Sequence, residues 1–161
     1  MKNALFLTAA LALSAAPMPA LSAPYCDELG NKDMLPSKYQ KRGPFYSDAE
    51  SGWIIGDDQL RADFTVTPEV SHLWNRINAE FQALGVRLVV MAAPPRPLFA
   101  DQAVRDAAGV PATFVADEMA AAFKGYVDAI NGAGITAPDL LAAAQSAPGP
   151  YYFQRDTHWT P

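Results

Sequence analysis

An amphipathic helix followed directly by an apolar run is the feature that most restricts the fold of this chain. Thr67-Pro68-Glu69 predicts a helix start, since a hydroxyl can cap the first turn, proline fits the first helical position and an acid faces the positive end of the helix dipole. Gly85 suits the residue after the helix. Between them the apolar residues fall on one face: Val70, Leu73, Trp74, Ile77, Phe81 and Leu84.

The next eight residues, 86–93 (VRLVVMAA), are nearly continuous in apolar character, which is typical of a strand covered on both sides. Prolines at 94, 95 and 97 end this strand, because proline cannot donate a ladder hydrogen bond. Further helices are expected at 113–131 and 139–145, and short strands at 52–58, 135–136 and 151–153. This alternation predicts an α/β fold, in which helices are layered on a parallel sheet.

Composition limits the functions that this chain can have. Its 161 residues are 50% hydrophobic, which is enough for one folded domain. With 12 basic and 17 acidic residues the formal charge is -5, so the basic surface that binds nucleic acid is absent. The net negative charge does not exclude a polysaccharide ligand, because one bound anionic sugar needs only one or two local cations.

The first 23 residues have the pattern of a cleaved secretory signal peptide. Lys2 precedes thirteen small or apolar residues, 4–16, and Pro17 interrupts the run. The run is too short for a stable membrane span, which needs about 20 apolar residues. We therefore expect an exported protein, with an extended leader at 24–51 and a domain from Gly52 onwards.

Cys26 is the single cysteine of the chain. Pro24 and Tyr25 stand where a lipoprotein signal needs small residues, so lipidation is not expected. An exported protein usually pairs its cysteines, which favours a partner thiol outside this chain. A buried free thiol is the alternative.

The chemistry-bearing residues lie near the end of the chain, at Asp156 and His158. Residues two apart in extended backbone share a face, so a bend could bring the carboxylate to the imidazole Nδ1. That contact would fix one tautomer and leave Nε2 free to take a proton, as in a nucleophilic triad. The alternatives are a surface pair and a buried, satisfied histidine. No cysteine or histidine cluster completes a metal site, and no cofactor is expected.

These residues also carry a family resemblance. The segment 156–161 (DTHWTP), just after a Tyr-Tyr pair, resembles the D-x-H-W-T motif of SGNH hydrolase-like domains of the AlgX/AlgJ type, which O-acetylate alginate in the bacterial periplasm. Residues 52–57 resemble the G-W-L-F-x-G-D opening of that domain. Residues 84–90 with Pro94-Pro95-Arg96 resemble its first core strand and Pro-rich loop, where the family often has lysine in place of Arg96.

The resemblance implies that His158 is a general base and Asp156 its orienting carboxylate. The family's nucleophile is a serine in a Gly-rich turn well after this motif, and neither G-x-S-x-G nor G-D-S occurs here. Thr160-Pro161 is itself a helix-start pattern. We therefore expect 52–161 to be the N-terminal part of an SGNH hydrolase-like domain, inactive alone, with its serine beyond Pro161.

Two residues are candidates for substrate binding. Arg96 follows the central strand, where open α/β sheets collect ligands, and could pair with a uronate carboxylate; an exposed arginine in a turn is the alternative. Trp159 could stack on a sugar ring or simply anchor the loop. The function expected is O-acetyl transfer, from an unidentified donor, to an anionic exopolysaccharide such as alginate, within a periplasmic export complex. The alternatives are a carbohydrate esterase and a non-catalytic polysaccharide-binding or assembly subunit.

Overall fold

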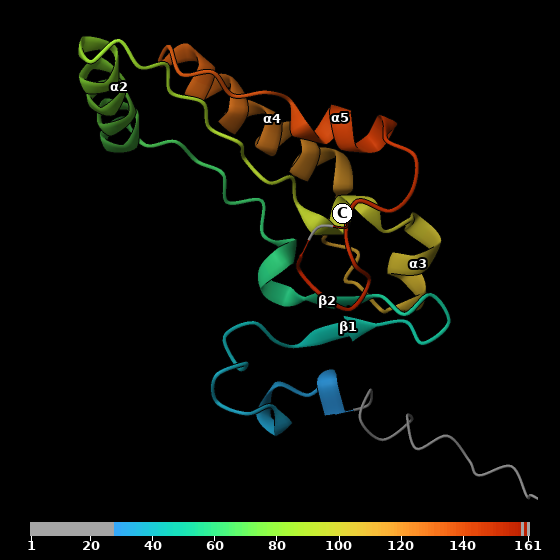
Figure 1. Ribbon diagram of the computed structural model, residues 1–161. Coiled ribbons are helices and arrows are strands. Elements are labelled where there is room, and N and C mark those ends of the chain that lie inside the picture. The colour runs from blue at the N-terminus through green and yellow to red at the C-terminus, as the bar shows by residue number, and fades with distance from the viewer. Residues whose placement is uncertain (1–27, 159, 161) are drawn as a thin grey trace, which may run out of the picture.

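The computed structural model describes residues 28–158 and 160 (Figure 1). The predicted signal peptide, Cys26 and Trp159 therefore lie outside the described residues. The regular elements are β1 (Phe45–Ser47), β2 (Ile54–Gly56), α2 (Pro68–Ala83), α3 (Gln102–Ala107), α4 (Ala116–Gly132) and α5 (Leu140–Ser146), with 3-10 turns at Lys32–Met34, Asp57–Leu60 and Arg96–Phe99. Among these residues no helix has both the length and the hydropathy to cross a bilayer.

A hairpin of β1 and β2 forms the sheet of the described chain. The strands are antiparallel, with Tyr46 opposite Ile55. The carboxylate of Asp48 accepts the backbone N–H of Ser51 at 2.9 Å in the connecting turn, and Gly52 supplies a φ of 76° that other residues avoid. The strand predicted at 52–58 is confirmed, and the segment predicted as a leader supplies its partner.

Helix α4 carries the main core, as its apolar spacing predicted. Its buried residues are Met119, Phe123, Val127 and Ile130. Phe123 is 1% exposed and meets Phe64 edge-to-face, with ring centroids 5.6 Å apart. The predicted short helix is also confirmed as α5, whose N-cap carboxylate, Asp139, accepts from the backbone N–H of Ala142 at 3.0 Å.

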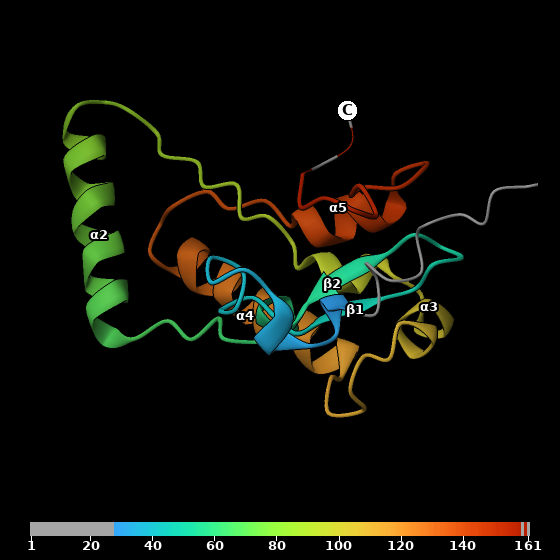
Figure 2. The same cartoon turned by 90° about the horizontal axis from the view of Figure 1, so that it is seen from below.

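Helix α2 forms where the sequence predicts it, but its apolar face is only partly buried. Thr67 Oγ1 accepts the N–H of Val70 at 3.4 Å, and Gly85 has a φ of 70°. Leu73 is nevertheless 53% exposed and Phe81 38% exposed. Figures 1 and 2 show that two long extended segments join α2 to the rest of the chain. The helix contacts the core around α4 through Trp74, and Asn78 Nδ2 donates to the carbonyl of Ala133 at 3.0 Å.

The described residues do not show the predicted parallel sheet. Residues 86–93 form no strand, and their β contact is one isolated parallel bridge from Val89 to Thr136. Val89 and Met91 remain largely exposed. A strand forms when several successive residues pair with a hydrogen-bonded neighbour, and among the described residues the pairing of 86–93 is limited to this one bridge.

In a second hydrophobic core, residues 151–152 pack against the Pro-rich segment 94–100. Its buried members are Trp53, Ile55, Ala100 and Tyr152. The Tyr152 hydroxyl donates to the carbonyl of Pro94 at 2.6 Å. Residues 151–153, expected as a strand, form an irregular segment held by these contacts. Helix α3, for which the sequence gives no clear helix signal, packs beside this core through Val104.

Candidate active site

The candidate site is a loop to which residues 151–158 and 160 contribute. The N–H of Phe153 donates to the carbonyl of His158 at 3.2 Å, and the N–H of Thr160 donates to the carbonyl of Tyr151 at 3.0 Å. The carbonyl of Gln154 accepts the N–H of Ile54 at 3.0 Å. The loop is therefore closed on itself and fixed to the edge of β2.

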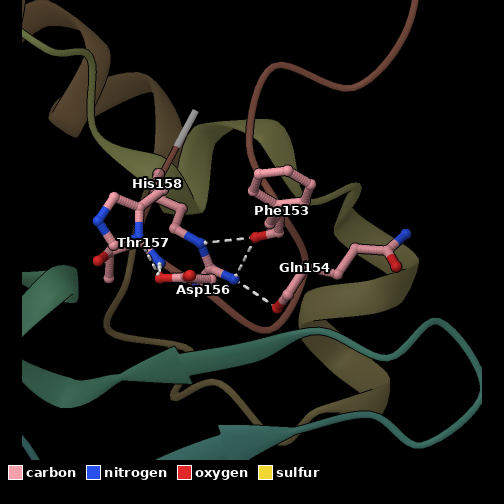
Figure 3. Close-up of polar contacts among 6 residues, drawn as sticks. Phe153, Gln154, Asp156, Thr157 and His158 are labelled. Atoms are coloured by element: carbon pink, nitrogen blue, oxygen red, sulfur yellow. Dashed lines mark hydrogen bonds and ion pairs between the residues drawn. The ribbon is translucent and has the colours of Figure 1, made fainter. Parts of the chain in front are cut away.

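Within this loop the carboxylate of Asp156 meets the imidazole of His158. His158 Nδ1 lies 2.8 Å from Asp156 Oδ1 (Figure 3). The same oxygen accepts the backbone N–H of Thr157 at 2.6 Å, which orients the carboxylate toward the ring. The structure thus makes the contact that the D-x-H spacing predicted. A catalytic role for the two residues stays a prediction.

The electrostatics of the pair favour an ionised carboxylate. The hydrogen bond with His158 lowers the pKa of Asp156, and the backbone N–H of Thr157 acts in the same direction. A neutral imidazole that donates Nδ1–H to this carboxylate must have an unprotonated Nε2. The side chain of His158 is 80% exposed and that of Asp156 is 54% exposed. Nε2 is therefore a proton acceptor on an open surface.

Arg96 lies behind this loop and is not the exposed turn residue considered from the sequence. It is 5% exposed and stacks over the Trp53 ring at 4.5 Å from the centroid. Its guanidinium donates to backbone carbonyls of β2 and of the loop, and to Gln59 Oε1. The guanidinium donors of Arg96 are thus already bound to protein acceptors. The pairing of Arg96 with a substrate carboxylate remains a prediction, and this geometry does not favour it.

Two open cavities adjoin the carboxylate of Asp156. One, of about 610 Å³, is lined by Ser51, Gly52 and Gln154 among others. The second, of about 510 Å³, is lined by polar and aromatic residues that include Tyr39, Arg42, Gln59, Arg96, Arg155 and Thr157. Tyr39 and Arg42 come from the segment predicted as a leader. No local pattern singles them out, because only the β1–β2 pairing brings that segment to the site.

Arg42 and Arg155 are exposed at the second cavity. Within residues 28–158 and 160, neither guanidinium forms a hydrogen bond or an ion pair with another side chain. They are therefore the cations available to an anionic ligand beside Asp156.

The described residues do not provide a nucleophile for His158. Ser51 Oγ accepts the N–H of Trp53 at 3.4 Å, and no described serine forms a hydrogen bond with His158. In the part of the chain that the structure describes, no cluster of three or more His, Cys, Asp or Glu side chains could hold a metal ion.

Comparison with known proteins places this fold and loop in a class. Residues 48–161 match the sequence model of a family described as "SGNH hydrolase-like domain, acetyltransferase AlgX". The match covers more than half of the chain, which is therefore an SGNH hydrolase-like protein. Within that class it belongs to the AlgX family, as its D-x-H-W segment implied.

Two relatives agree with this assignment. The chain is 26% identical over 170 residues to the "Alginate biosynthesis protein AlgX" of Azotobacter vinelandii, covering 96% of this chain and 35% of that protein. It also resembles the solved structure of Pseudomonas aeruginosa AlgX, with a TM-score of 0.67 and 23% identity, over 84% of this chain and 32% of that one. The chain thus spans about a third of the length of these relatives.

Proposed function

We propose that this chain carries the base and its orienting carboxylate of a periplasmic enzyme that O-acetylates alginate or a related acidic exopolysaccharide. The observation that carries the proposal is the 2.8 Å contact between His158 Nδ1 and Asp156 Oδ1 in an exposed loop. Membership of a family described as acetyltransferase, and a relative named for alginate biosynthesis, support the reaction and the polymer.

The proposed reaction has two steps that share one base. Nε2 of His158 takes the proton of a serine hydroxyl that lies outside the described residues, and the serine oxygen attacks the acetyl carbonyl of the donor. The donor's leaving group departs with that proton, and an acetyl-serine ester remains. Nε2 then takes the proton of a sugar hydroxyl, whose oxygen forms the new ester while the serine oxygen leaves and recovers the proton. Asp156 stabilises the imidazolium in both steps.

The acceptor is proposed to lie in the cavity that adjoins Asp156. Arg42 and Arg155 line this cavity and pair with no other described side chain, and a guanidinium matches a carboxylate with two parallel hydrogen bonds. Tyr39 offers an aromatic ring to a sugar face. A polymer of uronate units presents both a carboxylate and a ring in every residue, so it suits this combination better than a neutral glycan.

The test is acetyl transfer to an oligouronate by the product of the complete open reading frame, with p-nitrophenyl acetate as donor. His158→Ala should lower transfer by at least about 100-fold, because it removes the general base. His72→Ala is the matched control, since His72 is the other histidine and lies exposed on α2. It should leave transfer unchanged.

The same assay separates the rival functions. Release of acetate without transfer to the oligouronate would indicate the esterase, which uses the same residues with water as acceptor. Undiminished transfer by His158→Ala would refute the proposed base. Oligouronate binding by a wild-type protein that neither transfers nor hydrolyses acetyl groups would favour the binding or assembly subunit.

A further inference from the structure

We propose that Arg96 is a positioning residue for the Asp156–His158 pair. Its buried guanidinium joins β2 to the backbone just before Asp156. It thereby holds the loop in the bent form that brings the two side chains together. This inference rests on the proposed function of the pair, but it concerns the geometry of the loop and can be tested without any acetyl transfer.

The hydrogen bonds of Arg96 connect three separate segments. Nη1 donates to the carbonyl of Ile54 in β2 at 2.6 Å and to Gln59 Oε1 at 3.3 Å. Nε and Nη2 donate to the carbonyl of Phe153 at 3.3 and 2.9 Å, and Nη2 also donates to the carbonyl of Gln154. The bonds to Phe153 and Gln154 are dashed in Figure 3.

These bonds act at the point where the loop bends. Gln154 is two residues before Asp156, and its carbonyl accepts both from Arg96 and from the N–H of Ile54. Phe153 is fixed through its carbonyl by Arg96, and its N–H donates to the carbonyl of His158. Arg96 therefore holds Phe153, and the hydrogen bond from the Phe153 N–H to the His158 carbonyl closes the loop.

The bonds seen in this chain need arginine, and the lysine that the family often has at this position could not form all of them. A planar fork of donors can serve carbonyls on two sides at once, whereas one ammonium on a flexible stem cannot. Cζ of the guanidinium lies over the Trp53 ring, 4.5 Å from its centroid. Burial lowers the pKa of Arg96 and the charge of Asp156 opposes that change, so the cation behind the loop and the carboxylate in front of it attract each other.

Arg105 provides a matched control in the same chain. It is 8% exposed, and its guanidinium donates to the carbonyls of Pro97 and Ala100 and to Gln102 Oε1. It is thus a second buried arginine that binds backbone carbonyls, but none of its partners lies in residues 151–160. Replacing it perturbs a buried guanidinium site without removing a contact to the loop.

The experiment records the ring-nitrogen signals of His158 by ¹⁵N NMR in the wild-type chain and in Arg96→Met, Arg96→Lys and Arg105→Met. Asp156→Ala supplies the reference signals for a ring without its carboxylate. In Arg96→Met the His158 signals should move most of the way to that reference. In Arg96→Lys they should move part of the way, and in Arg105→Met they should stay at the wild-type position.

Two results would overturn the inference. One is a folded Arg96→Met variant with wild-type His158 signals. The other is an equal shift in Arg105→Met, which would mean that any buried-arginine loss loosens the loop. If Arg96→Met does not fold, Arg96→Lys provides the test. Wild-type His158 signals in folded Arg96→Lys would then contradict the positioning role of Arg96. Acetyl transfer enters none of these readouts, so failure of the proposed function and failure of this inference are distinguishable.

Discussion

Replacing Tyr152 by phenylalanine tests the anchoring of the candidate loop on the Pro-rich loop. The Tyr152 side chain is buried, and its hydroxyl donates to the buried carbonyl of Pro94 at 2.6 Å. The substitution removes the bond, which has a net value of about 1 kcal/mol, and leaves a carbonyl without a donor, which costs about 1–3 kcal/mol. We expect the free energy of unfolding to fall by about 1–3 kcal/mol.

Tyr126→Phe is the control for this change. Tyr126 is a half-buried tyrosine on α4 whose hydroxyl makes no hydrogen bond within residues 28–158 and 160. Its removal should alter stability by less than about 0.5 kcal/mol. The assay is urea unfolding, in which the midpoint should fall for Tyr152→Phe while the slope stays constant. Equal midpoints for the two variants would refute the reasoning.

Two further predictions concern the core and the pH dependence. Phe123→Ala should lower the free energy of unfolding by about 3–5 kcal/mol, because Phe123 is fully buried. Phe81→Ala on the exposed face of α2 should lower it by less than about 1 kcal/mol. Equal decreases for the two variants in urea unfolding would show that the face of α2 is covered in solution. The pKa of Asp156 is lowered in the folded loop, so ionised Asp156 stabilises the fold fully above the ordinary carboxyl range, and this stabilisation is lost as the pH falls through the folded pKa. Asp156→Asn should therefore make the free energy of unfolding depend less on pH at acidic pH. An unchanged pH dependence would contradict the lowered pKa.

Local signals in the sequence predicted helices α2, α4 and α5 and the contact between Asp156 and His158. Thr67 and Asp139 cap α2 and α5 as their positions in the sequence indicate. The i, i+2 spacing of Asp156 and His158 predicted their contact because that contact needs only a local bend. Features set by a few neighbouring residues can be read from the chain itself.

Features that depend on distant partners could not be predicted. The apolar face of α2 and the run 86–93 carry the pattern of buried elements, yet the described residues provide no complete cover for either. Arg96 stands in a Pro-rich loop that reads as exposed, and its burial results from β2 and residues 153–154 closing over it. No local pattern encodes such a closure.

The ring tautomer of His158 tests the central claim most directly. The claim is that Asp156 holds the imidazole with its proton on Nδ1 and leaves Nε2 to accept one. ¹⁵N NMR at a pH where imidazoles are neutral should show that tautomer for His158 alone, while the exposed His72 in the same spectrum serves as the reference. A His158 signal that matches His72, and that does not change in Asp156→Ala, would contradict the account.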